Sequence, residues 1–182
     1  MNATVKPPKE IVRRAESDKK TAPPADRQAL IDGLNHDLAG EYQAIVMYIH
    51  YSAKLTGPFR RELRSLFQAE VVDEQGHAQF LSDKIAAMGG EPTTEPRPVA
   101  HVSQPRQMLE AALGAEVQAI ADYTARIGQA ELCGEIGLKV ALENQLADET
   151  RHKEELERII AGWFDPERKA DENRWQDDGG QR

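Results

Sequence analysis

The sequence carries one polar pattern twice, and the second copy follows the first at a constant offset of 75 residues. Five pairs of polar side chains obey this offset: Glu41 and Glu116, Glu74 and Glu149, His77 and His152, Tyr48 and Tyr123, and Asp73 and Asp148. In each copy a Glu-x-x-His string follows the first Glu by 33 residues. A constant offset over five pairs indicates an internal repeat, in which each copy is one supersecondary unit packed against the other.

Each copy contains two long segments with the periodicity of a helix. The predicted helices cover residues 26–55, 58–88, 105–130 and 135–161. Asp26 is the predicted N-cap of the first helix, and Pro58 the predicted start of the second. The links within each copy are short, whereas residues 89–104 contain three prolines and form a long link without much helix. The chain is therefore predicted to be an all-α, antiparallel four-helix bundle with one long crossover between helices 2 and 3.

Composition limits the class of protein. A chain of 182 residues is suited to one domain, and 30% charged with 5% aromatic residues favours helices. The net charge of −8 argues against binding of nucleic acid or acidic lipid by the chain as a whole. No apolar run is long enough for a signal peptide or a membrane span, so a cytoplasmic location is expected. The single cysteine, Cys133, is expected to be a small buried residue rather than a reactive thiol.

Three parts are predicted along the chain: residues 1–25 as a flexible basic arm, 26–162 as the helical domain, and 163–182 as a polar C-terminal tail. The arm has six basic residues against three acidic ones. This excess is small, so a solvated tail is favoured over contact with DNA, which stays an alternative. Trp163 and Trp175 are expected to pack at a helix end or a subunit contact.

Helix geometry explains the spacing of the repeated residues. A Glu and a His three residues apart lie on one face of a helix. If these faces point inward, four carboxylates and two imidazoles converge in the core, where uncompensated carboxylates would each cost several kcal/mol. Two divalent cations remove this cost. The predicted ligands of one metal are Glu41, Glu74 and His77, and those of the other are Glu116, Glu149 and His152, with Glu74 and Glu149 shared.

The alternative, a set of surface salt bridges, is disfavoured because mostly apolar residues flank Glu41 and Glu116. Asp73 and Asp148 are predicted to accept the second ring N–H of the His on the opposite helix, the alternative being exposed surface acids.

Tyr48 and Tyr123 lie on the faces of the first glutamates, nearly two turns away. They are predicted to hydrogen-bond the ligands or to donate an electron, or to be core tyrosines anchored by their hydroxyls. The three other histidines fall off the ligand faces and receive no role: His36, His50 and His101.

This ligand set resembles that of the ferritin-like di-iron superfamily over about residues 26–162. The chain is most similar to bacterioferritins and bacterioferritin-like mini-ferritins, and the strings at residues 73–77 and 148–152 carry most of the similarity. The resemblance implies a ferroxidase that oxidises Fe(II) with O2 or H2O2. It also implies two iron ions per subunit and a hollow homo-oligomer for iron storage or detoxification.

Three departures from these relatives narrow the prediction. The Met that binds haem in bacterioferritins is replaced by Gln75, so haem is not expected. The additional glutamate of rubrerythrins is replaced by Ala119, and one cysteine cannot form their rubredoxin-type module. The residues after 161 do not read as a fifth helix, which leaves a 12-subunit or smaller shell open. Two other functions remain: a di-manganese catalase or peroxidase on the same ligands, and a DNA-protecting shell protein with a structural metal site.

Overall fold

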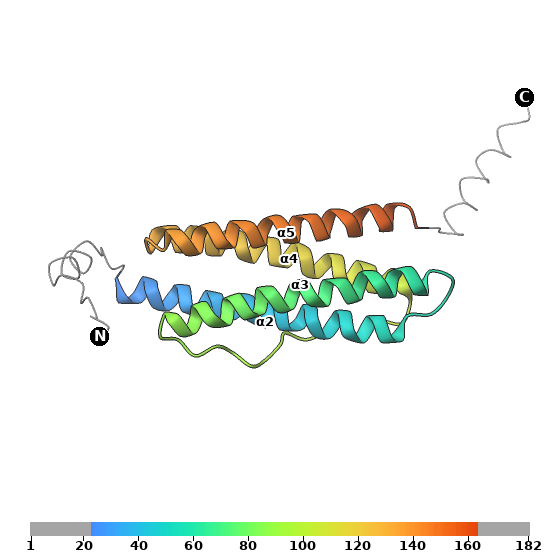
Figure 1. Ribbon diagram of the computed structural model, residues 1–182, viewed down its shortest axis with the longest axis horizontal. Helices are drawn as coiled ribbons and strands as arrows, with labels where there is room; N and C mark the ends of the chain where they lie inside the picture. Colours follow the sequence, from blue (N-terminus) through green and yellow to red (C-terminus); the bar gives the residue numbers. More distant parts are fainter. Residues whose placement is uncertain (1–22, 164–182) are drawn as a thin grey trace, which may run out of the picture.

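The computed structural model describes residues 23–163. In that range it consists of four long helices without any strand: α2 (Pro24–Lys54), α3 (Arg60–Ala87), α4 (Pro105–Leu132) and α5 (Ile136–Ala161). The helices lie side by side along one axis (Figure 1). The predicted all-α four-helix bundle is confirmed. Among the described helices, none combines the length and the apolar character that crossing a membrane requires.

The helix starts differ from the predicted ones. Asp26 is not an N-cap, because α2 already begins at Pro24, where a missing N–H costs nothing, and Asp26 lies in the first turn. A carboxylate there interacts favourably with the positive end of the helix dipole. Pro58 does not begin the second helix. The chain reverses at Gly57, which has a φ of 85°, and α3 begins only at Arg60.

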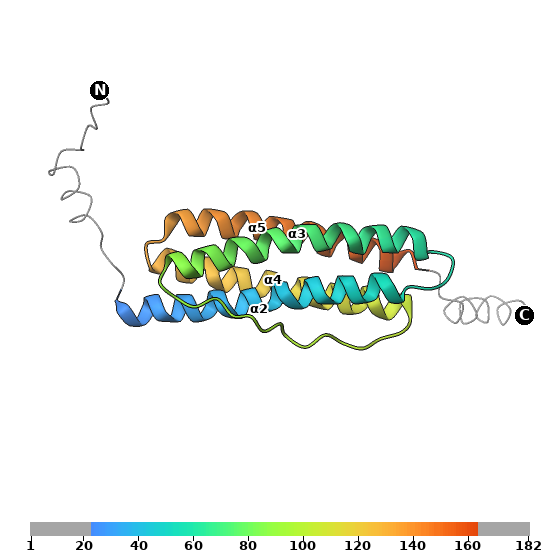
Figure 2. The same cartoon turned by 60° about the horizontal axis from the view of Figure 1, so that its bottom comes forward.

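The helices pair as two antiparallel hairpins, α2 with α3 and α4 with α5, which pack against each other (Figures 1 and 2). The link between the hairpins, residues 88–104, runs along α2 (Figure 2). Its hydrogen-bond partners on α2 follow in chain order: Glu91 with Asn35, Arg97 with Ala39, Pro98 with Gln43, Ala100 with Tyr51, and Val102 with Lys54. The link therefore runs parallel to α2, so that α4 starts beside the C-terminal end of α2 and runs antiparallel to it.

The interior consists of two apolar clusters separated by a polar layer. The polar layer contains the buried side chains of Glu41, Glu74, His77, Glu116, Glu149 and His152. One cluster contains Leu34 and Leu81, and the other contains Leu109 and Leu156. Leu34 and Leu109, like Leu81 and Leu156, differ by 75 residues, and all four are buried. The repeat therefore extends to the apolar core. The polar layer lies between the clusters along every helix.

Trp163 and Cys133 pack at the ends of the bundle. Trp163 packs against Phe59 with 5.6 Å between the ring centroids, at the end where α5 finishes and α3 begins. Cys133 is half-buried, and its thiol donates to the carbonyl oxygen of Asp26 at 3.5 Å. Trp175 lies outside the described residues, as do residues 1–22 of the predicted arm and 164–182 of the predicted tail.

Candidate metal centre

The six predicted ligands lie together in the polar layer, and each of the four helices contributes at least one. All six are buried, with exposed fractions from 0% to 7%. Their donor atoms form two overlapping groups: Glu41, Glu74, His77 and Glu149, and Glu74, Glu116, Glu149 and His152. Within each group the donor atoms lie within 4.8 Å of one another. Glu74 and Glu149 belong to both groups, which places one carboxylate of α3 and one of α5 between two adjacent sites.

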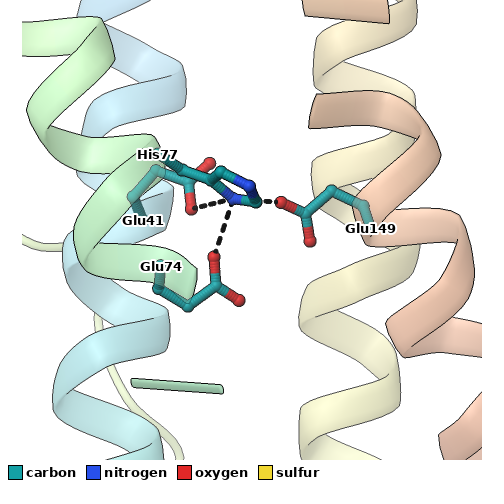
Figure 3. A group of neighbouring side chains, drawn as sticks. All are labelled: Glu41, Glu74, His77 and Glu149. Atoms are coloured by element: carbon teal, nitrogen blue, oxygen red, sulfur yellow. Dashed lines mark hydrogen bonds and ion pairs between the residues drawn. The ribbon is translucent and has the colours of Figure 1, made fainter. Parts of the chain in front are cut away.

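His77 shows how one group is arranged (Figure 3). Its Nδ1 lies 2.8 Å from Glu149 Oε1, 3.2 Å from Glu74 Oε2 and 3.8 Å from Glu41 Oε2. Glu41 and Glu74 extend from α2 and α3, and Glu149 extends from α5 on the opposite side (Figure 3). One imidazole nitrogen therefore faces three carboxylates that belong to three different helices.

The tyrosine hydroxyls join the two hairpins. Tyr48 on α2 donates to Glu116 on α4, and Tyr123 on α4 donates to Glu41 on α2. Both tyrosines are buried. Each hydroxyl therefore holds the carboxylate of the facing hairpin rather than that of its own helix.

The aspartates face the outer nitrogens of the imidazoles. Asp148 Oδ2 lies 3.8 Å from His77 Nε2, and Asp73 Oδ2 lies 3.4 Å from His152 Nε2. Each of these pairs joins α3 to α5. A carboxylate that accepts the outer ring N–H of an imidazole orients the ring so that its other nitrogen can bind a cation.

Comparison with known proteins identifies the family to which this arrangement belongs. A family model described as a ferritin-like domain matches residues 31–163. The chain belongs to the ferritin-like family. It is similar to a solved structure from Bacillus anthracis str. Ames, described as a ferritin-like, diiron-carboxylate protein, with 47% sequence identity and a TM-score of 0.73. That match covers 74% of this chain and 97% of the other. A search of curated proteins finds no match. The resemblance to the ferritin-like di-iron superfamily is confirmed.

Burial shifts the pKa values of the four glutamates in the polar layer. Burial, and then the charge of Glu149, raise the pKa of Glu41 to about 7. Burial likewise raises the pKa of Glu74 and that of Glu116 well above the ordinary value. Burial opposes ionisation of Glu149 as well, but its contacts with the imidazoles of His152 and His77 prevail and lower its pKa to about 2. At neutral pH the cluster therefore retains protons that a cation would have to displace.

The donor set fits two divalent cations. Glu74 Oε1, Glu149 Oε2 and His152 Nδ1 are buried, and none has a hydrogen-bond partner among residues 23–163. Buried polar atoms are normally paired, so a group of unpaired ones fits a site that binds a cation. Four carboxylates carry four negative charges, which two divalent cations neutralise while the imidazoles stay neutral. Carboxylate oxygen with imidazole nitrogen suits iron and manganese. These features support a di-metal site and leave the identity of the metal open.

Two polar groups beside the cluster were missed in the sequence. Glu70 Oε2 lies 3.2 Å from His152 Nε2. Residue 70 lies one turn before residue 74 on α3, so helical spacing places it on the ligand face, but it has no identical counterpart in the second copy. Asp37 and Arg126 form a buried ion pair between α2 and α4, at 2.8 and 3.1 Å. Charged residues far apart in sequence give no local pattern from which such a pair follows.

The remaining histidines lie outside the polar layer. His36 Nε2 is 3.6 Å from Asp122 Oδ1, and its side chain is largely exposed. The rings of His50 and His101 pack edge to face with 5.5 Å between their centroids. None of the three belongs to the two groups of donor atoms.

Proposed function

We propose that this ferritin-like chain is a ferroxidase that binds two Fe(II) ions in the polar layer and oxidises them to Fe(III). The observation that carries the proposal is the duplicated set of four buried carboxylates and two imidazoles, whose charge balances two divalent cations. Iron supplies one electron from each ion to O2 or H2O2. With O2, two electrons and two protons give H2O2; with H2O2, two electrons and two protons give two molecules of water.

The side chains divide this work. The proposed ligands of one iron are Glu41, Glu74 and His77, those of the other are Glu116, Glu149 and His152, and Glu74 and Glu149 are shared. Asp148 and Asp73 orient the two imidazoles through Nε2, while Tyr48 and Tyr123 orient the two unshared carboxylates. Such cross-hairpin contacts would hold the unshared carboxylates and the imidazoles in the metal-free protein, which would lower the cost of ordering them when iron binds.

Iron binding changes the protonation of the cluster. Glu41, with a pKa of about 7, and the more strongly shifted Glu74 and Glu116 retain protons in the metal-free protein. Iron binding displaces these protons, and reduction of the oxidant consumes two. Carboxylates that bind iron hold no proton, so the two protons that the oxidant takes up come from solvent.

The proposal includes assembly into a homo-oligomeric shell for iron storage or detoxification. Large apolar side chains remain exposed on the outer faces of the bundle, among them Leu132 at 84%, Val72 at 66% and Ile136 at 58%. We take these exposed apolar side chains as candidate contacts between subunits. Light scattering coupled to size-exclusion chromatography, with the iron content of the same fractions, tests this part.

Anaerobic titration with Fe(II), followed by admission of air, tests the activity. The absorbance of ferric iron is expected to saturate near two irons per chain. Glu74→Gln removes a shared ligand and is expected to abolish fast oxidation, whereas Glu143→Gln, at an exposed position of α5, is expected to leave it unchanged. Fast oxidation in the Glu74→Gln variant contradicts the proposal. Manganese in protein from the native host, with O2 released from H2O2, would instead favour the catalase.

A further inference from the structure

The 75-residue repeat breaks beside one of the two imidazoles. The offset aligns Glu70 with Gln145 and Arg151 with Gly76. All ten residues that define the repeat keep their identity, so these two changes stand next to an otherwise duplicated site. The surroundings of the two metal positions therefore differ in charge although their ligands are the same.

The outer nitrogen of His152 faces three charged groups. Glu70 Oε2 lies at 3.2 Å and Asp73 Oδ2 at 3.4 Å, both on α3. Arg151 Nη2, on α5, lies at 3.4 Å from the same nitrogen. Two carboxylates and one guanidinium leave a net negative charge at this nitrogen. The Glu70 side chain is only 12% exposed, so water screens its charge weakly.

The outer nitrogen of His77 has a more neutral environment. Asp148 Oδ2 lies 3.8 Å away, and the other oxygen of the same carboxylate accepts a hydrogen bond from Arg151 at 2.7 Å. The residue equivalent to Glu70 is Gln145, an uncharged amide, which is buried and whose Oε1 has no hydrogen-bond partner in the described chain. One partly neutralised carboxylate therefore replaces the two carboxylates that face His152.

A carboxylate at the outer nitrogen strengthens a metal-bound imidazole. It accepts the ring N–H, which increases electron density on the nitrogen that binds the cation, and its removal typically lowers metal affinity 10- to 100-fold. We propose that Glu70 makes the two metal positions unequal, so that the position served by His152 binds the first divalent cation. Glu70 acts through His152 and is thus a positioning residue. This inference rests on the di-metal site of the proposed function and adds an order of filling to it.

Cobalt(II) tests the inference because it binds carboxylate and imidazole and air oxidation is slow. Calorimetry of the metal-free protein is expected to resolve two binding steps of unequal affinity. Anomalous X-ray scattering from crystals with one cobalt per chain is expected to place the metal next to His152. Glu70→Gln keeps the side-chain volume and is expected to weaken the first step by roughly 10- to 100-fold.

The repeat offers a matched variant. Gln145→Glu introduces a carboxylate at the position that the repeat aligns with Glu70, and it is expected to strengthen the second step. The double variant, with Glu70→Gln and Gln145→Glu, is expected to move the first cobalt from the His152 position to the His77 position. A purely structural role of Glu70 would lower thermal stability without changing the order of filling, so thermal melts of each variant accompany the titrations.

Equal occupancy of both positions at one cobalt per chain in the wild-type protein would overturn the inference. An order of filling that is unchanged in both the Glu70→Gln and the Gln145→Glu variants would overturn it as well. The outcome is separable from that of the proposed function. Ordered cobalt binding without iron oxidation refutes the ferroxidase and leaves the inference standing, whereas iron oxidation with equal cobalt binding does the reverse.

Discussion

Replacement of Glu41 by Gln is expected to stabilise the metal-free protein, and increasingly so as the pH rises. Burial, and then the charge of Glu149, raise the pKa of Glu41 from 4.5 to about 7. The folded state thus holds this proton more tightly than the unfolded state does. For a group with a raised folded pKa, the free energy of unfolding falls as the pH rises from about 4.5 to about 7. Gln cannot ionise, so the variant escapes this loss.

The size of the effect follows from the shift. One pKa unit corresponds to about 1.4 kcal/mol, so a shift of 2.5 units (7 minus 4.5) amounts to about 3 kcal/mol above pH 7. At pH 5 the same relation gives under about 1 kcal/mol. Gln has nearly the volume of Glu, and its carbonyl oxygen still accepts the hydrogen bond of Tyr123. The change in charge therefore dominates the difference.

Urea unfolding of metal-free protein at pH 5, 6, 7 and 8 measures the difference. The unfolding midpoint of the Glu41→Gln variant should exceed that of the wild type by a margin that grows with pH, at an unchanged slope. Glu143→Gln is the control, because Glu143 is exposed. With cobalt(II) the order should reverse, since the intact ligand set binds more cobalt than the variant and is stabilised more strongly by mass action. A difference that is independent of pH, or a variant that is less stable at every pH, would refute the reasoning.

Two further predictions concern the helix contacts and the protons. Gly33→Ala is expected to destabilise the protein by about 2–3 kcal/mol, because a Cβ there would lie 1.6 Å from Arg126 Nη1 and displace the guanidinium from the buried Asp37. Gly128→Ala, where a Cβ meets no atom within 4 Å, should instead stabilise the protein by about 0.5–1 kcal/mol. Chemical denaturation measures both variants, and equal effects on the free energy of unfolding would contradict the prediction. Cobalt binding is expected to release more protons at pH 6 than at pH 8, since the pKa of Glu41 is about 7. Calorimetry in buffers of different ionisation enthalpy counts the released protons, and a number that does not fall from pH 6 to pH 8 would contradict the prediction.

The polar layer could be predicted from the sequence because helical spacing alone decides which residues share a face. Glu74 and His77, three residues apart, must point to the same side of α3, and the constant offset transfers this arrangement to α5. The short and long links then leave few ways to pack two hairpins. Helix starts were less predictable. Asp26 is a good N-cap residue, but Pro24 already favours the first turn of a helix. Composition does not decide which of two such neighbouring residues begins the helix.

Contacts between helices were predictable only where the repeat indicated them. The Asp37–Arg126 ion pair joins α2 to α4, and neither residue has an identical counterpart 75 positions away. Which residues of α2 and α4 face each other depends on the rotation of each helix about its axis, and apolar packing decides that rotation. The course of the link along α2 could not be predicted either, since its hydrogen bonds use main-chain carbonyls that no side-chain pattern reveals. The asymmetry at Glu70 was visible in the sequence but acquires meaning only from its distance to His152.

Several contacts of the polar layer connect one hairpin to the other. Tyr48 reaches Glu116, and His77 reaches Asp148 and Glu149, in each case across the boundary between α2–α3 and α4–α5. One hairpin alone holds only half of the ligands, so the metal site forms when the hairpins dock. Without cations, Glu74 and Glu116 keep their protons at neutral pH, because ionisation of all the acids across this boundary would oppose docking. In the proposed metal-bound state two cations would displace these protons, and the four acids would then hold the hairpins together.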